Sequence, residues 1–62
     1  MTNALNRAEQ IMTQYVEMTG GPMDSIALTD AITDLALWGY SNGFDSAESV
    51  REAMETHVPA ER

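Results

Sequence analysis

Apolar residues recur at helical spacing through the middle of the chain and make its longest periodic segment. Asp24 or Ser25 is placed to cap the first turn of this segment, and Asn42-Gly43 supplies a left-handed stop. The pattern predicts a helix of about five turns over residues 25–42. At about 100° per residue, one side carries the residues that we expect to face the core, which are Leu28, Ala31, Ile32, Leu35, Trp38 and Gly39.

The opposite side of this central helix is polar apart from one residue. Asp30, Asp34 and Ser41 fall on that side, and Leu37 lies in the middle of them. This position predicts a large apolar side chain in water beside two carboxylates. Because Tyr40 also lies away from the centre of the core side, we expect Leu37 and Tyr40 to contact a partner.

The segment before the central helix predicts a first helix over residues 3–19, with Asn3 as its cap. Gly20-Gly21-Pro22 should end it, because two glycines followed by a proline stop a helix. Its inner side carries Met1, Leu5, Ala8, Met12, Tyr15, Val16 and Thr19. The connection to the central helix is short, so the two helices should lie as antiparallel neighbours.

A third helix is predicted over residues 46–58. Phe44 stands where a Schellman ending makes its hydrophobic contact, and Asp45 and Glu48 have the spacing of a capping box. The inner side of this helix carries Ala47, Val50, Ala53, Met54, His57 and Val58. Pro59 should end the helix, which leaves residues 59–62 as a frayed tail.

Carboxylates recur one helical turn apart on both later helices. Asp30 and Asp34 are spaced in this way, as are Glu48 and Glu52, and like charges at this spacing cost about 0.2–0.5 kcal/mol. On the third helix the outward-pointing acids form an acidic ridge, which consists of Asp45, Glu48, Glu52 and Glu55. These acids indicate either a solvated face or a surface that binds a basic partner.

Together the three segments predict an all-α protein, a small three-helix bundle that forms a single domain over residues 1–62. A chain of 62 residues buries only about 60% of the surface that its unfolded form exposes. Either the helices pack economically or a partner completes the core.

Charge is the most informative property of the composition. Ten acidic residues stand against three arginines, with no lysine, and the formal net charge is −7. No basic residue lies between Arg7 and Arg51. This balance disfavours direct binding to nucleic acid or to an anionic membrane and favours a partner with a basic surface. The alternative is that the charge serves solubility only.

Composition also limits the compartment and the chemistry that we expect. There is no cysteine and no apolar run of about 18 residues, so we expect a soluble cytoplasmic protein. His57 is the only histidine, and its place near a helix end fits a capping or core-edge role better than a metal ligand or general base. No nucleophile elbow, phosphate loop or calcium loop is present, so we expect no enzyme activity, no cofactor and no metal.

Two resemblances bear on function. Short proteins encoded by phages and mobile elements are similar to the segment Thr33-Asp34-Leu35-Ala36-Leu37-Trp38, with Asn42-Gly43-Phe44-Asp45 and then Ala53 and His57 after it. The whole chain, which is small, lysine-free, acidic and without a catalytic set, resembles the small anti-CRISPR proteins. Several of these imitate the charge of nucleic acid and occupy a basic groove of a Cas effector. The resemblance implies a phage inhibitor that acts in the cytoplasm of the host cell.

The interpretation that joins these observations is a non-enzymatic inhibitor that docks an acidic surface on a basic, nucleic-acid-binding surface as a charge mimic. A Cas effector subunit is the concrete candidate for the partner. The alternative is a homodimeric structural or regulatory module that completes its core through Leu37 and Ile26, and both a monomer and a homodimer fit the sequence. The residues that we expect to bind the partner are Asp30, Asp34, Leu37, Tyr40, Asp45, Glu48, Glu52 and Glu55.

Overall fold

The computed structural model describes residues 3–62, and Met1, expected on the inner side of the first helix, lies outside them. The helical elements are α1 (Asn3–Thr19), α2 (Ser25–Ser41), α3 (Ser46–Glu52), the π-helical segment η1 (Ala53–His57) and α4 (Val58–Glu61). Because α3, η1 and α4 follow without a break, they form one continuous third helix. The predicted fold class, a small all-α three-helix bundle, is confirmed. No helix among residues 3–62 is long and apolar enough to cross a membrane.

Aspartate side chains cap the starts of α2 and α3, as the sequence predicts. Asp24 Oδ1 accepts a hydrogen bond from the backbone N–H of Ala27 at 3.0 Å, which decides between Asp24 and Ser25 as the cap. Asp45 Oδ1 accepts one from the N–H of Glu48 at 3.1 Å. Each cap satisfies a backbone donor that the first turn leaves without a partner inside the helix.

The third helix continues past Pro59, where the sequence predicts its end. In a regular α-helix the proline ring would clash with the carbonyl four residues earlier. Here the N–H of Val58 donates to the oxygen of Ala53, five residues back, and this π turn widens the helix just before the proline. Pro59 follows this wider turn, and because its ring nitrogen carries no N–H it donates no backbone hydrogen bond of its own. The expected end at residue 58 is therefore wrong, because the helix runs on to Glu61.

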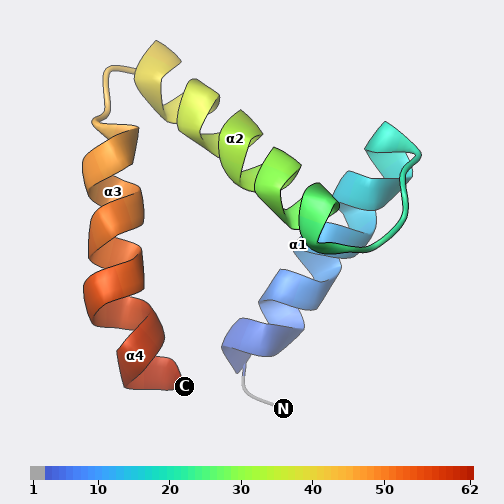
Figure 1. Cartoon of the computed structure of the whole chain (residues 1–62), viewed down its shortest axis with the longest axis horizontal. Coiled ribbons are helices and arrows are strands. Elements are labelled where there is room, and N and C mark those ends of the chain that lie inside the picture. The colour runs from blue at the N-terminus through green and yellow to red at the C-terminus, as the bar shows by residue number, and fades with distance from the viewer. Residues whose placement is uncertain (1–2) are drawn as a thin grey trace.

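The three-helix bundle is open. α1 packs on α2, and α2 packs on α3, but within residues 3–62 α1 does not pack on the third helix. Figure 1 shows α1 crossing the N-terminal half of α2, and the third helix descending from the other end of α2. The radius of gyration is 12.5 Å, whereas about 10.6 Å is usual for a compact chain of this length. The helices therefore touch in sequence order without closing around a common core.

The residues buried between the helices are small. Among residues 3–62 the buried apolar side chains are Ala27 and Ala31 of α2, and Gly39 and Ser46 are buried as well. The predicted core side of α2 is therefore right for its small residues and wrong for the large exposed ones, which are Leu28, Ile32, Leu35 and Trp38. The inner side of the third helix is also largely uncovered, since Val50 and Met54 are exposed.

Candidate functional site

A groove of about 390 Å³, lined mainly by apolar residues, lies between α2 and the third helix. None of the described residues that line it is charged. Its lining, which we call the apolar groove, consists of Ile32, Leu35, Ala36, Trp38, Gly39, Phe44, Ser46, Ser49, Val50, Ala53 and Met54. The groove therefore collects residues that the sequence pattern assigned to the core.

The large side chains of α2 stay uncovered because its two neighbours contact it on different sides. At about 100° per residue, Leu28 and Leu35 lie on the arc between Ala31 and Gly39. Those two small residues are buried, whereas 62% of Leu35 and 50% of Leu28 is exposed. α1 bonds to α2 at Asp34 and the third helix bonds to it at Ala36. Since α1 does not pack on the third helix, the two leucines that lie between these contacts stay largely exposed.

Gly39 and Ser46 hold the two walls of the groove close together. The Ser46 hydroxyl, which is buried, donates a 2.7 Å hydrogen bond to the backbone oxygen of Ala36. A Cβ atom on residue 39 would collide with Ser46 Oγ. Glycine at this point of α2 therefore allows the close approach that the hydrogen bond needs.

The end of α2 forms the Schellman motif that the sequence predicts. The N–H of Phe44 donates to Gly39 O at 2.9 Å, and the N–H of Gly43 donates to Tyr40 O at 3.1 Å. Gly43 has a φ of 82°, which suits glycine. The expected hydrophobic contact is made by Trp38 and Phe44, whose ring centroids lie 6.0 Å apart with an interplanar angle of 45°. This pair forms one end of the apolar groove.

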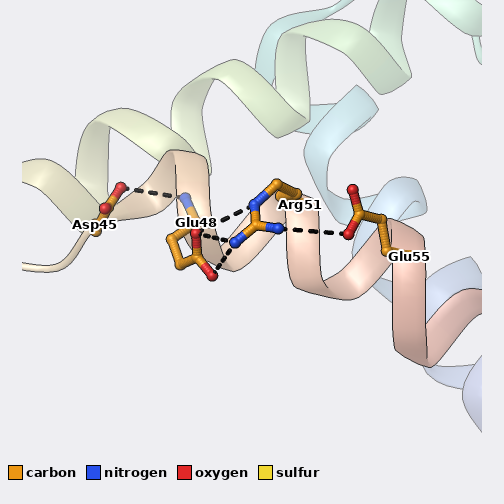
Figure 2. Close-up of polar contacts among 4 residues, drawn as sticks. All are labelled: Asp45, Glu48, Arg51 and Glu55. Atoms are coloured by element: carbon orange, nitrogen blue, oxygen red, sulfur yellow. Dashed lines mark hydrogen bonds and ion pairs between the residues drawn. The ribbon is translucent and has the colours of Figure 1, made fainter.

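The acidic ridge also contains a cation, Arg51, whose position does not follow from the net charge. Figure 2 shows Arg51 between Glu48 and Glu55, with its guanidinium donating to both carboxylates. Arg51 Nε lies 3.2 Å from Glu48 Oε2, and Nη1 lies 3.5 Å from Glu55 Oε2. Asp45 caps α3, so Glu52 is the ridge residue without a hydrogen bond or ion pair among residues 3–62. Helical spacing therefore brings Arg51, which the sequence interpretation did not place on the acidic ridge, next to two of its acids.

Asp34 forms a hydrogen bond with a residue of α1. The Tyr15 hydroxyl donates a 2.6 Å hydrogen bond to Asp34 Oδ2. This bond raises the pKa of Tyr15 to about 12, and partial desolvation and the charges of Asp34 and Asp30 act in the same direction. The polar side of α2 therefore partly faces α1. Asp30, which forms no hydrogen bond or ion pair within the described chain, remains available on this side.

Leu37 is exposed, as predicted, with 62% of its surface accessible. Tyr40 is exposed as well, but its hydroxyl accepts a hydrogen bond from the backbone N–H of Ala47 at 3.2 Å. Tyr40 therefore satisfies a donor in the first turn of α3 in addition to any role in binding. That both residues contact a partner stays a prediction.

His57 lies inside the continuous third helix, so the expected capping role at a helix C-terminus is wrong. The helix goes on for one more turn through α4, and the His57 side chain makes no hydrogen bond among the described residues. Residues 3–62 contain no group of three or more histidine, aspartate or glutamate side chains placed to hold a metal ion.

The sequence interpretation did not include the ion pairs of Arg51, and it named Gly39 and Tyr15 only as core-facing residues, without the contacts that they make. Arg51 stands three residues after Glu48 and four before Glu55, which is a readable signal for ion pairs on a helix. Gly39 inside a helical pattern is a signal for close backbone approach. Tyr15 carries no local signal of its bond to Asp34, because the two residues are 19 positions apart.

The chain matches no protein-family model, no curated protein sequence and no solved structure.

Proposed function

We propose that this chain is a non-enzymatic interaction protein that binds another protein chain through the apolar groove. The observation that carries the proposal is the exposure of the large apolar side chains of α2 and the third helix. The apolar residues that are buried among residues 3–62 are two alanines of α2, Ala27 and Ala31. Fully burying one such side chain contributes about 1.5–3 kcal/mol, so a partner that covers several of them gains substantial free energy. Large contiguous apolar patches of this kind mark protein interaction sites.

The chemistry of the groove supports binding better than catalysis. Its described lining carries no titratable side chain. Of its two hydroxyl groups, that of Ser46 is committed to the backbone of α2. A groove of this kind offers apolar contact area and no acid, base or activated nucleophile.

Site-specific photo-crosslinking tests this proposal. A photoreactive amino acid replaces Leu35 in the groove or, as a matched control, Leu37 on the opposite side of the same helix. Both leucines are 62% exposed, so the two probes have equal access to solvent. In cells that naturally make the protein, the probe at residue 35 should form covalent adducts with a protein, and the probe at residue 37, which lies outside the groove, should not capture that same protein. Absence of protein adducts from residue 35 would contradict the proposal.

A second candidate function is the docking of the acidic outer surface onto a basic partner, as expected for an anti-CRISPR-type inhibitor of a Cas effector. Asp30 and Glu52 support it, because both are exposed and have no hydrogen bond or ion pair among residues 3–62. Neither residue lines the apolar groove. One molecule can therefore use the groove for one contact and the acids for another.

Competition with nucleic acid tests the second candidate. The protein should displace DNA or RNA from a Cas effector, and the Asp30→Asn/Glu52→Gln variant should compete less well at low salt. The loss should lie mainly in the association rate and shrink as salt rises, because exposed charges act through screened long-range attraction. Equal competition by the variant and the parent would show that these acids do not contribute to docking and serve solubility only.

A further inference from the structure

The isolated chain exposes more surface than is usual for a monomeric globular protein of its size. Its solvent-accessible surface is 5086 Å², whereas a monomeric globular protein of 6.8 kDa exposes about 4,000 Å². The excess is about 1,100 Å². A standard protein interface takes about 800 Å² from each partner, so the excess is enough for one whole interface.

The distribution of charge allows two copies to meet at their grooves. Each copy carries a net charge of −7, yet no described residue of the groove is charged. Asp34 is held by Tyr15 of α1, and Glu48 pairs with Arg51 on the acidic ridge. Neither carboxylate lines the groove, so an interface between two grooves does not bring the carboxylates of the two copies into contact. An uncharged lining also gives a basic partner segment no carboxylate to pair with, so it fits an apolar helix better.

The chain itself supplies such an apolar helix. Leu28 and Leu35 are seven residues apart, so they lie almost in line along α2, and both are at least half exposed. A two-fold axis makes one surface meet a copy of itself, so each α2 can enter the groove of the other chain. Among residues 3–62 the buried apolar side chains are alanines, so this part of the chain has no core of large side chains. Obligate homodimers supply such a core by association.

We infer that the protein is a two-fold symmetric homodimer in which Leu28 and Leu35 of each α2 fill the apolar groove of the second copy. This inference rests on the proposed function and names the second copy as the occupant of the groove. An interface that covered the whole excess of each copy would bury about 2,200 Å² in total, which lies in the range of obligate homodimers.

Sedimentation equilibrium of the purified chain tests the inference. The wild-type protein should sediment with twice the mass of the 6.8 kDa chain and dissociate on dilution. Leu35→Ala should raise the dimer Kd by about thirtyfold or more, because a buried anchor at the centre of an interface carries much of the affinity. Leu37→Ala is the matched control, and it should change the Kd by no more than about twofold. A monomer at the concentration of an NMR sample, or equal weakening by both variants, would overturn the inference.

A crosslinking measurement keeps the inference testable if Leu35→Ala does not fold. The chain has no cysteine, so Leu35→Cys and Leu37→Cys each introduce a single thiol. A short bifunctional thiol reagent should join two Leu35→Cys chains covalently and leave Leu37→Cys chains single. The opposite pattern would place Leu37 in the interface and overturn the proposed arrangement.

The photo-crosslinking experiment separates failure of this inference from failure of the proposed function. Adducts between residue 35 and a different protein, together with a purified chain that stays monomeric, would overturn the homodimer and keep the groove as a binding site. No adducts and a monomeric chain would overturn both. The single tryptophan, Trp38, adds a readout: dimer formation should protect it from acrylamide quenching, since 60% of it is exposed in the isolated chain. Full quenching in the associated protein would overturn an interface at the groove.

Discussion

The buried hydroxyl of Ser46 donates a 2.7 Å hydrogen bond to the backbone oxygen of Ala36, and this bond ties the third helix to α2. The bond forms beside Gly39, at the one point of α2 where the missing side chain leaves room for the Ser46 hydroxyl. Because Gly39 and Ser46 both line the apolar groove, this contact sets the distance between its walls.

Gly39→Ala is expected to lower the free energy of unfolding by up to about 2 kcal/mol. The added methyl group displaces the Ser46 hydroxyl from the Ala36 oxygen and leaves buried polar groups without partners, which costs about 1–3 kcal/mol. The opposing gain in helix propensity is only about 1 kcal/mol. Urea unfolding at a fixed protein concentration measures the difference.

Repeating the substitution in a Ser46→Ala background should reverse its sign. Without the hydroxyl, the nearest atom of residue 46 to the new methyl group is Cβ, at 3.4 Å, an ordinary contact distance. Gly39→Ala should then stabilise the protein by up to about 1 kcal/mol through helix propensity. Equal effects in the two backgrounds would show that Gly39 and Ser46 are not energetically coupled.

Gly43→Ala should destabilise the protein by about 1–2 kcal/mol, because its φ of 82° places any residue with a Cβ in the costly left-handed region. Gly21→Ala is the control: its φ is not positive and its added Cβ meets nothing within 4 Å. That control should be neutral or slightly stabilising. Thermal unfolding of both variants gives the comparison, and a Gly43→Ala variant as stable as the wild type would contradict the left-handed ending of α2.

Tyr15 should make stability depend on pH in the alkaline range. Its pKa rises from 10.0 to about 12 in the folded chain, chiefly because its hydroxyl donates to Asp34. A group with a raised folded-state pKa contributes stability that is complete below the unfolded pKa. We therefore expect this contribution to be present below pH 10 and to be lost as the pH rises towards 12.

Tyrosinate absorbance during an alkaline titration measures the Tyr15 pKa directly. Tyr15→Phe should remove the titration step near pH 12. Asp34→Asn should move that step to lower pH, because it replaces the charged acceptor with a neutral one. A step that stays near pH 12 in Asp34→Asn would mean that another group holds the Tyr15 proton.

Arg51→Gln tests whether the acidic ridge binds a basic partner. The substitution changes the net charge from −7 to −8 and leaves Glu48 and Glu55 without their cation. Exposed ion pairs contribute little, so folding stability should fall by less than about 1 kcal/mol. Affinity for the Cas effector of the competition assay should rise at low salt and return to the parental value at high salt. Unchanged affinity at low salt would show that the acidic ridge is not part of the docking surface.

The sequence was sufficient to predict the helices because their determinants are local. The caps Asp24 and Asp45 act within one turn, and the Schellman ending at Gly43 uses bonds that span only a few residues. The exposure of Leu37 also follows from its place among polar residues on one helix. The π turn before Pro59 did not follow, since a proline inside a helical pattern more often ends the helix than widens it.

The arrangement of the helices was decided by the tertiary structure. Periodicity places Leu28 and Leu35 on an apolar side of α2, but it does not say whether one neighbour, two neighbours or another chain covers that side. In the structure α1 bonds to α2 at Asp34 and the third helix bonds to it at Ala36, which leaves Leu35 in the apolar groove and Leu28 half exposed. The bonds from Tyr15 to Asp34 and from Ser46 to Ala36 likewise join residues 19 and 10 positions apart. Such contacts depend on how separate helices meet, and no local pattern encodes that geometry.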